Sequence, residues 1–484
     1  MITLADVIEA ITQSRPVLPA FAMLAITEAA IDSRQVTQGA LFVAIPGEKV
    51  DGHNFVAQAF QRGAVVALIE HEIAEPYPVI DLRSGTLVCG LGAVDAPLCL
   101  LVDNTVVALQ RVAAFWRSRL NLRVVGITGS VGKSTSKEAI AGVLSQRFST
   151  LKSAANLNNE IGLPLNVLKL TEAHQCAVLE MGFYVPGEIA LLCEIARPQV
   201  GVLTNIGTVH AERAGSQDAI ALGKGELVEA LPAAPEGTAI LSYDDPWVRP
   251  MKSRTRATVF YYGMNPEADL WADQVESLGL DGIRFRLHHK HETVSMQVPM
   301  IGRHSVETAL RAAAVGLVED LSWDEITRGL QENKAQFRLV AARAENGALV
   351  LDDTYNATPE STLAALSLMF DLPPGQPAGT GGRRIAVLGD MLELGQYERI
   401  GHEKIGARAA EVADVLLTLG PRARIIAEAA ANAGMSRTAI HEYDALGPVA
   451  DWLKQNLGAG DVVLIKGSRG LRMDQIVATL ELVR

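Results

Sequence analysis

The segment from Arg123 to Thr135 constrains the fold of this chain more than any other. It reads RVVGITGSVGKST, in which an apolar run is followed by a glycine-containing turn and by a helical stretch that begins near Lys133. Such a turn lets backbone N–H groups wrap around a phosphate, and the positive end of the following helix favours its negative charge. The segment therefore predicts a nucleotide-binding α/β domain.

The residues of this turn also indicate the chemistry of the ligand. Gly129 and Gly132 let the backbone approach a phosphate, and Lys133 has the length to reach its β and γ oxygens. The hydroxyl of Ser134 suits Mg²⁺. The strict form of the pattern has glycine where this chain has Ile127, so a purely structural use of the turn stays an alternative. We expect ATP and Mg²⁺ to bind here.

The length of the chain predicts several domains, because one domain takes roughly 150 residues and this sequence has 484. Short apolar runs between turn residues predict a small α/β domain in residues 1–105. Strand signals that alternate with helical stretches in residues 106–334 are typical of a mostly parallel sheet. Four apolar runs that each end near Gly, Asp or Lys predict a doubly wound, Rossmann-like α/β domain in residues 335–484.

Two segments in the middle of the chain alternate apolar and polar residues with a period of two. They cover residues 283–289 and 293–299, and they predict an antiparallel hairpin or meander within the central sheet. His288, His289 and His291 fall at its turn. Three histidines suggest a metal site, but they cannot all converge from a strand and its turn, so we favour a solvated turn.

Composition excludes several classes of function. Lys and Arg number 43 against 55 Asp and Glu, and the resulting net charge of −12 disfavours binding to nucleic acids or acidic membranes. The four cysteines, Cys89, Cys99, Cys176 and Cys193, form no C-x-x-C pair, so we expect reduced thiols and no zinc site. We also expect no transmembrane helix and no secretory signal, and therefore a cytoplasmic protein.

Polar residues at the ends of predicted strands are further candidates for the site. Glu180 follows an apolar run, and the carboxyl ends of parallel strands are where open α/β sheets bind ligands. Its carboxylate suits Mg²⁺, with an ordinary surface glutamate as the alternative. Taken singly, His210 and Lys224 are more typical of structural residues, and the Asn-rich segment 152–160 fits a capped turn as well as a site.

Taken together, these residues resemble the Mur ligase family over essentially the whole chain. The motifs are DSRQVTQGALFVAIPGEKVDGHNF (32–55), ITGSVGKSTSKE (127–138), NLNNEIGLPLNVL (156–168), LEMG (179–182), TNIGTVHAERAGS (204–216), GRHS (302–305), LDDTYNATPES (351–361), VLGDMLELG (387–395) and IKGSRGLRMD (465–474). The resemblance implies a three-domain ATP-dependent amide ligase of peptidoglycan synthesis. The motifs at 351–361 and 387–395 point to the branch that joins D-alanyl-D-alanine to UDP-N-acetylmuramoyl-tripeptide through an acyl phosphate.

The resemblance also implies roles for individual residues. The residues expected to bind ATP are Thr128, Gly129, Ser130, Val131, Gly132, Lys133, Ser134, Thr135, Asn205, Arg338 and Asp353. Those expected to bind the UDP-peptide are Ser33, Arg34, Asp51, Gly52, His53, Asn156, Asn158 and Asn159. The expected catalytic residues are Lys133, Glu180, His210 and Lys224. Ser134 and Glu180 are expected to hold one Mg²⁺, and His210 with Lys224, if carbamylated, a second.

Three positions depart from the pattern of the family. Ser305 stands where Asn is usual, which removes an amide that could pair with adenine. Thr358 also replaces a usual Asn, and Phe337 stands where Gly is common. None of these changes affects the phosphate turn, an expected metal ligand or the expected carbamylated lysine, so we expect an active enzyme. We separately expect a monomer.

Two other functions stay open. One is a relative that applies the same activation to another carboxylate, such as a folate or a different UDP-peptide. The other is a degenerate nucleotide-binding or scaffold protein. The joint presence of Lys133, Glu180 and Lys224 argues against the second, and the substrates that trigger phosphate release distinguish the first.

Overall fold

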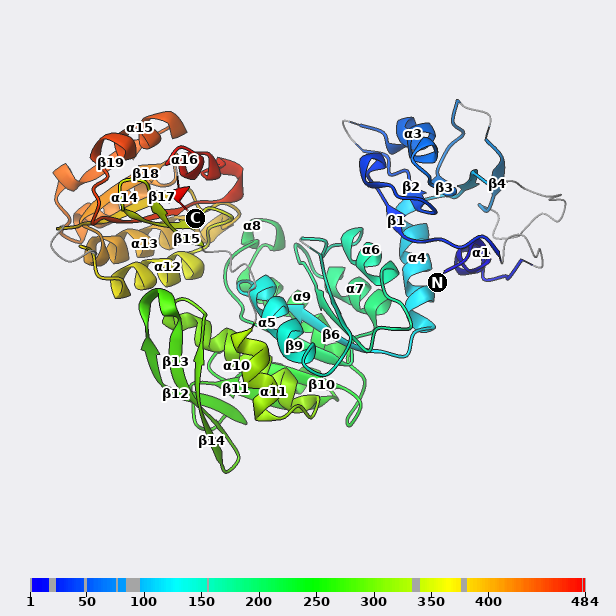
Figure 1. Cartoon of the computed structure of the whole chain (residues 1–484), viewed down its shortest axis with the longest axis horizontal. Helices are drawn as coiled ribbons and strands as arrows, with labels where there is room; N and C mark the ends of the chain where they lie inside the picture. The colour runs from blue at the N-terminus through cyan, green and yellow to red at the C-terminus, as the bar shows by residue number, and fades with distance from the viewer. Residues whose placement is uncertain are drawn as a thin grey trace.

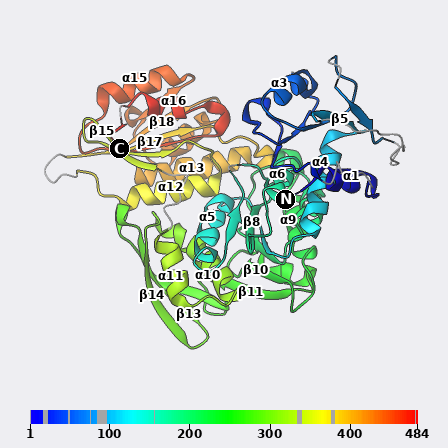
Figure 2. The ribbon, with the colours of Figure 1, turned by 45° about the vertical axis from the view of Figure 1, so that its right-hand side comes forward.

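Three α/β units follow one another along the chain, each with its own sheet (Figure 1). The computed structural model describes residues 2–16, 23–47, 50–74, 77–83, 96–154, 156–332, 340–375, 381–480 and 482–483. Figures 1 and 2 both place the first and third units on opposite sides, with the central unit below and between them. The three-unit α/β fold is confirmed, whereas the boundaries near residues 105 and 334 stay predictions.

The first unit has a wholly parallel five-stranded sheet, ordered β1-β2-β3-β5-β4. Its strands are β1 (Ala29–Ala30), β2 (Leu41–Val43), β3 (Val66–Ile69), β4 (Val79–Asp81) and β5 (Leu98–Leu101), and its helices α1 (Leu4–Thr12), α3 (Val56–Gln61) and α4 (Thr105–Ser118). Every residue of β2, β3 and β5 is buried, as a parallel sheet covered on both faces requires. Helix α4 packs against α1 and also against α6 (Gly162–Leu168) and α7 (Glu188–Ala196) of the central unit, so it joins the two units.

The central unit has a nine-stranded sheet, ordered β14-β13-β12-β11-β10-β9-β6-β8-β7. Its strands are β6 (Arg123–Thr128), β7 (Thr150–Lys152), β8 (Cys176–Glu180), β9 (Val200–Leu203), β10 (Thr238–Ser242), β11 (Thr258–Gly263), β12 (Leu270–Ser277), β13 (Ile283–His289) and β14 (Glu292–Val298). The sheet is parallel from β7 to β12, and β13 and β14 extend it as an antiparallel edge. The mostly parallel sheet and its hairpin are therefore confirmed.

The placement of the histidines at this hairpin needs a correction. His288 and His289 lie in β13, and only the exposed His291 lies in the turn. The strand continues this far because both residues still pair with β14, His288 with Thr293 and His289 with Glu292. The ring of His288 also stacks on Trp271 and bonds to Asp273, so this side chain is part of the sheet surface.

Helices cover both faces of the central sheet. They are α5 (Lys133–Leu144), α6 (Gly162–Leu168), α7 (Glu188–Ala196), α8 (Ala211–Ala214), α9 (Gln217–Glu229), α10 (Val306–Val318) and α11 (Trp323–Gln331). Successive side chains of a strand point to opposite faces. Accordingly Val124 of β6 joins one apolar core while Val125 and Ile127 join the other. Strand β6 is thus held from both sides at the position where the phosphate turn begins.

The third unit has a seven-stranded sheet, ordered β19-β18-β17-β20-β16-β15-β21. Its strands are β15 (Val340–Ala344), β16 (Leu349–Asp353), β17 (Arg384–Gly389), β18 (Val415–Leu419), β19 (Ile440–Tyr443), β20 (Val462–Lys466) and β21 (Leu482–Val483), and its helices α12 (Pro359–Asp371), α13 (Glu398–Val412), α14 (Arg424–Asn432), α15 (Leu446–Asn456) and α16 (Asp474–Ala478). The strands from β19 to β16 are parallel, whereas β15 and β21 form an antiparallel edge. This agrees with the Rossmann-like expectation.

The structure can be compared with two expectations from composition, reduced thiols and the absence of a transmembrane helix. Cys99, Cys176 and Cys193 are buried free thiols, and Cys89 lies outside the described residues. In the part of the chain that the structure describes, we find no helix with the length and apolar character needed to cross a bilayer.

Candidate active site

A cleft of about 920 Å³ lies between the central and third units. Strands β6, β8 and β9 are parallel neighbours, so their carboxyl ends meet at one edge of the sheet. Residues at or beyond these ends line the cleft from one side, among them Lys133, Glu180 and His210. Asp353 and Glu393 of the third unit line it from the other side. The site therefore depends on side chains from both units.

The phosphate turn lies between β6 and α5, as the sequence predicts. Gly129 has φ +144°, and a Cβ added there would lie 1.9 Å from the Oγ1 of Thr204. Gly132 has φ +84° and caps the start of α5. Both positions therefore require glycine. The Nζ of Lys133 donates to the carbonyl oxygen of Gly129 at 2.7 Å, which places its ammonium group over the turn.

Residues after β9 hold the phosphate turn from behind. The Oδ1 of Asn205 accepts from the backbone N–H of Val131 at 2.9 Å, and its carbonyl oxygen accepts from that of Ser130 at 2.9 Å. Thr204 Oγ1 donates to the carbonyl oxygen of Val131 at 2.6 Å. These bonds fix the turn in place. Asn205 also lines the cleft, and its contact with ATP stays a prediction.

A buried carboxylate lies beside the turn. The hydroxyl of Ser134 donates to Oε2 of Glu180 at 2.8 Å, and the amide of Asn158 donates to Oε1 at 2.9 Å. Glu180 is only 1% exposed, and burial of a carboxylate costs free energy. The two hydrogen bonds offset this cost. Hydroxyl and carboxylate oxygens are the donors that Mg²⁺ prefers, so the residues present fit this ion.

Lys224 lies on α9, is fully buried, and contacts the phosphate turn. Its Nζ donates to the carbonyl oxygen of Gly129 at 3.1 Å and lies 4.6 Å from the ring centre of Phe183. Burial, with the nearby charge of Lys133, holds the pKa of Lys224 well below its ordinary 10.5. The lowered pKa means that a larger share of Lys224 is the neutral amine, which carries a reactive lone pair, than in an exposed lysine.

His210 joins the two sides of the cleft. Its Nδ1 lies 2.7 Å from Oε2 of Glu393 in the third unit, and its ring meets that of Tyr184 edge to face. Burial first, and then the charges of Lys224 and Lys133, lower the pKa of His210 to about 3, so the ring is neutral at physiological pH. The three residues that the sequence analysis combined, Glu180, His210 and Lys224, thus lie around one turn.

The third unit brings Asp353 into the cleft. This residue ends β16, and its Oδ2 accepts from the Nζ of the buried Lys466 at 2.6 Å. Lys466 also donates to the carbonyl oxygen of Asn356 at 2.9 Å. Arg338 and Phe337, the other expected or unusual residues of this unit, lie outside the described residues.

Two departures from the family pattern have local partners. Ser305 lines the cleft, but its hydroxyl donates to the carbonyl oxygen of Ile301 at 2.8 Å. Thr358 caps the start of α12 in a capping box with Ser361. Threonine is a good N-cap residue, so this substitution keeps the helix start intact.

Arg311 is a residue of the site that the sequence analysis did not single out. It is buried on α10, and its guanidinium donates to the Oγ of Ser136 at 2.7 Å and to the hydroxyl of Tyr262 at 2.9 Å. A Cβ added at Gly132 would lie 3.1 Å from its Nη1. Arg311 therefore supports the start of α5. The available signal was one arginine in the apolar stretch ETALRAAAV.

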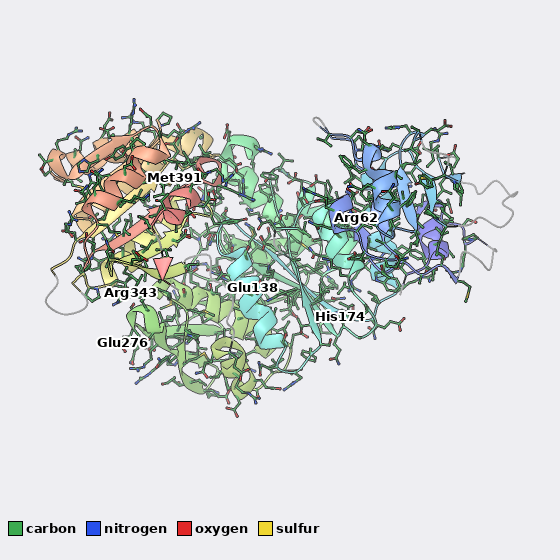
Figure 3. All side chains as sticks on the ribbon, turned by 45° about the horizontal axis from the view of Figure 1, so that its top comes forward. Arg62, Glu138, His174, Glu276, Arg343 and Met391 are labelled. Atoms are coloured by element: carbon green, nitrogen blue, oxygen red, sulfur yellow. The ribbon has the colours of Figure 1, made fainter. Side chains whose placement is uncertain are left out.

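The Asn-rich loop lies at the cleft, whereas the expected first-unit residues do not. The cleft is lined by Asn156, Asn158 and Asn159. Every lining residue that the structure describes belongs to the central or the third unit, so none of the expected first-unit residues lines it. Figure 3 shows Arg62 of the first unit and Met391 of the third on opposite sides of Glu138, which lies on α5.

The expected first-unit residues have local partners instead. The hydroxyl of Ser33 donates to Gln58 Oε1 at 2.6 Å. The guanidinium of Arg34 is exposed and pairs with Asp32, two residues earlier. Gly52 begins a short 3-10 helix, Gly52–Phe55, whose N-cap is Asp51.

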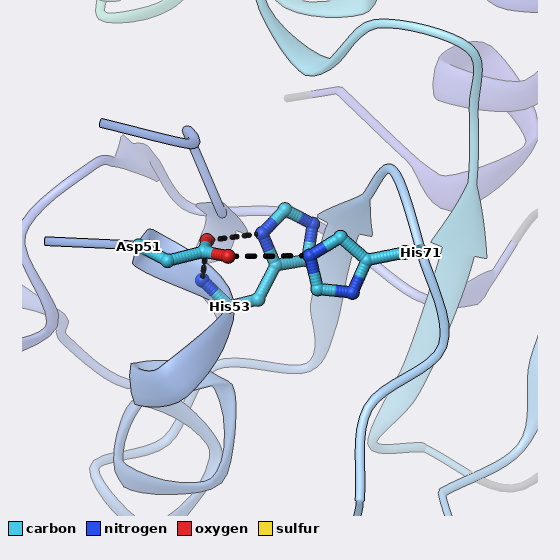
Figure 4. Close-up of side chains that lie close together, drawn as sticks. All are labelled: Asp51, His53 and His71. Carbon is cyan, nitrogen blue, oxygen red and sulfur yellow. Dashed lines mark hydrogen bonds and ion pairs between the residues drawn. The ribbon is translucent and has the colours of Figure 1, made fainter. Parts of the chain in front are cut away.

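Asp51, His53 and His71 form a compact cluster in the first unit (Figure 4). Asp51 bonds to Nδ1 of His53 at 2.6 Å and to Nε2 of His71 at 3.2 Å, and the two rings stack at 3.8 Å. The Nε2 of His53 accepts from the backbone N–H of Glu70 at 2.8 Å, so its Nδ1 carries the proton. Both nitrogens of His53 are therefore engaged, which argues against a metal site here.

The phosphate turn, the buried acid beside it and the cleft closed by another unit define a class, the nucleotide-binding α/β proteins with a site shared between units. The Mur ligase middle domain matches residues 127–316, the Mur ligase glutamate ligase domain residues 337–469, and the Mur ligase family catalytic domain residues 25–84. The chain belongs to the Mur ligase family.

Similar proteins match along nearly the whole chain. The UDP-N-acetylmuramoyl-tripeptide–D-alanyl-D-alanine ligase of Bacillus subtilis is 33% identical over 464 residues, covering 96% of this chain and 94% of that protein. MurF from Acinetobacter baumannii has a TM-score of 0.82 at 28% identity, covering 99% of this chain and 98% of that one. MurF ligase from Thermotoga maritima, solved in complex with ADP, has a TM-score of 0.76 at 26% identity, covering 95% and 98%.

Proposed function

We propose that this protein is an ATP-dependent amide ligase that joins D-alanyl-D-alanine to UDP-N-acetylmuramoyl-tripeptide in peptidoglycan synthesis. The observation that carries the proposal is a phosphate turn and a buried carboxylate in one cleft, within a chain that matches ligases of this name over almost its whole length. The substrates are ATP and two small peptides, so a few local cations are sufficient despite the net charge of −12.

The chemistry has two steps. A carboxylate oxygen of the tripeptide attacks the γ-phosphorus of ATP, the bond to the β-phosphate oxygen breaks, and ADP leaves. The amine nitrogen of D-alanyl-D-alanine then attacks the carbonyl carbon of the acyl phosphate, loses a proton, and expels phosphate as the amide forms. Lys133 and the backbone N–H groups at the start of α5 hold and align the phosphates, which is the main contribution of a protein to phosphoryl transfer.

Ser134 and Glu180 are proposed to hold one Mg²⁺, which when bound offsets the negative charge of the phosphates. His210 and Lys224 are proposed to hold a second. For this role Lys224 must become an anion: its neutral amine attacks CO₂, an N–C bond forms, and a proton leaves to give a carbamate. The depressed pKa of Lys224 supports this step, because only the neutral amine is a nucleophile.

The remaining residues are assigned by unit. Residues 1–105 are proposed to hold the UDP moiety through Ser33, Arg34, Asp51, Gly52 and His53, which requires Arg34 to exchange Asp32 for the ligand. Asn156, Asn158 and Asn159 are proposed to face the peptide. Residues 335–484 complete the ATP site through Asp353 and Arg338 and admit D-alanyl-D-alanine. The protein is proposed to act as a monomer in the cytoplasm, where ATP and UDP-linked precursors are available.

Phosphate release tests this proposal against the same chemistry on another carboxylate. The protein is incubated with ATP, Mg²⁺, UDP-N-acetylmuramoyl-tripeptide and D-alanyl-D-alanine, and then with each omitted in turn. We expect release only with the full set, and no release from Lys133→Ala. Release that does not require the dipeptide would contradict the proposal, and failure of the full set to react would favour a scaffold or another substrate.

A further inference from the structure

The bond between His210 and Glu393 determines which nitrogen of the histidine carries a proton. Glu393 Oε2 lies 2.7 Å from Nδ1, and an ionised carboxylate can only accept a hydrogen bond. Nδ1 therefore carries a proton and donates it to Glu393. Nε2 does not face Glu393, so it is the ring nitrogen left to offer its lone pair to a metal ion.

Backbone and side-chain contacts dock the segment around Glu393 onto the central unit. The carbonyl oxygen of Glu393 accepts from the N–H of Glu212 at 3.3 Å, and the amide of Gln396 donates to the carbonyl oxygen of Gly215 at 3.3 Å. The 3-10 helix η6 (Gly395–Tyr397) thereby packs against α8 (Ala211–Ala214). Figure 1 shows α8 at the side of the central unit that faces the third unit.

The contact between η6 and α8 is close, and the backbone at the two bonded residues has an unusual conformation. A Cβ added at Gly395 would lie 3.0 Å from the backbone nitrogen of Glu212. His210 has φ 70° and Glu393 has φ 64°, so both bonded residues adopt the left-handed conformation that side chains disfavour. Such conformations persist only where surrounding contacts hold them, and they concentrate at functional sites.

We propose that Glu393 is a positioning residue, which fixes the tautomer and ring orientation of His210 so that Nε2 serves the second metal ion only when the third unit is docked on α8. Carboxylates that hold the distal nitrogen of a ligating histidine are common partners of metal sites. Glu393 belongs to the third unit and His210 to the central one, so docking of the two units and metal affinity are coupled. The inference rests on the proposed function, because it requires the second metal ion.

The test uses the full-length protein and Mn²⁺ as the probe. Binding of Mn²⁺ in the presence of ADP is followed by electron paramagnetic resonance for the wild type, Glu393→Gln and Glu403→Gln. Loss of an outer partner of a metal ligand weakens binding by roughly tenfold or more, so we expect this for Glu393→Gln. Glu403 is a matched control, because it is a partly exposed glutamate of the same unit that pairs with Arg399.

A second readout reports the tautomer directly. In protein with ¹⁵N-labelled histidine, the resonances of His210, identified by their loss in His210→Gln, should show a protonated Nδ1 in the wild type. Glutamine offers both a donor and an acceptor, so Glu393→Gln should shift this pattern toward a protonated Nε2. Glu393→Asp, which keeps the charge, serves if Glu393→Gln fails to fold, and it should weaken Mn²⁺ binding through its shorter reach.

The outcomes separate this inference from the proposed function. Unchanged Mn²⁺ affinity together with unchanged His210 resonances in the folded variants would overturn the inference, as would the absence of a second Mn²⁺ in the wild type. Neither readout requires turnover. If Glu393→Gln weakens Mn²⁺ binding and shifts the His210 tautomer, but the wild type forms no amide, the proposed function is overturned and the role of Glu393 stays intact.

Discussion

The hydroxyl of Ser134 donates to Oε2 of Glu180 at 2.8 Å and so connects the first turn of α5 with the end of β8. Because both oxygens of this carboxylate accept hydrogen bonds in a buried site, its charge cannot be replaced by an amide without loss.

Glu180→Gln should therefore lower kcat/KM by about 100-fold or more, as expected when a charged group that acts on the transition state is neutralised. Steady-state kinetics with Mg²⁺ and ATP measure this effect, and a thermal melt checks that the variant is folded. Glu172→Gln, an exposed glutamate on a surface loop, is the control and should retain activity. A Glu180→Gln protein with unchanged kcat/KM would remove Glu180 from the site.

Gly129→Ala should impair both nucleotide binding and stability. Its Cβ would collide with Thr204, whose hydroxyl holds the carbonyl group of Val131 in the phosphate turn. Gly187→Ala is the control, since Gly187 also has positive φ but has nothing within 4 Å of an added Cβ. Isothermal titration with ADP should show weaker binding for Gly129→Ala, and equal losses in the two variants would contradict the steric account.

Lys224 should carry a carbamate when CO₂ is supplied. Its buried amine has a pKa well below 10.5, which favours the nucleophilic form. Protein equilibrated with ¹³CO₂ should give a carbamate carbon resonance that is absent in Lys224→Arg and retained in Lys252→Arg, a change at an exposed lysine. CO₂-free buffer should also slow turnover. A resonance that persists in Lys224→Arg would assign the modification elsewhere.

His71 should make the stability of the first unit depend on pH. Its bond to the carbonyl oxygen of Glu72, with that to Asp51, raises the pKa of His71 above its ordinary 6.5. The folded protein then holds the proton more tightly than the unfolded chain, so the stabilisation is complete below pH 6.5 and is lost as the pH rises through the raised pKa.

The side chain of His71 is 57% exposed, so solvent screens its ion pair. We expect His71→Gln to lower the free energy of unfolding by less than about 1 kcal/mol, with the larger loss near about pH 5.5 and the smaller near about pH 8.5. Urea unfolding at both pH values measures the difference. His291→Gln, at an exposed turn, should show none, and an equal loss for His71→Gln at both pH values would contradict the assignment.

Local features of the site could be predicted from the sequence because their parts are contiguous. A strand, two glycines and a lysine within thirteen residues define the phosphate turn, and the structure places each of them as expected. Glu180 could be placed near the turn because the carboxyl ends of parallel strands share one edge of the sheet.

Partners distant in the sequence could not be predicted in this way. His210 and Glu393 are 183 residues apart, and Arg311 and Ser136 are 175 apart. Neither pair has a spacing that a helix or strand period would reveal. The motif predicts that Arg34 binds substrate, whereas its side chain pairs with Asp32 in the structure, an interaction that the two-residue separation favours.

The central claim is that the tripeptide carboxylate is activated as an acyl phosphate and captured by D-alanyl-D-alanine. It is tested by supplying UDP-N-acetylmuramoyl-tripeptide with both oxygens of its reacting carboxylate labelled with ¹⁸O. The account predicts that mass spectrometry finds one ¹⁸O in the released phosphate and the other in the new amide of the pentapeptide product. Phosphate without ¹⁸O, or release with no pentapeptide formed, would contradict it.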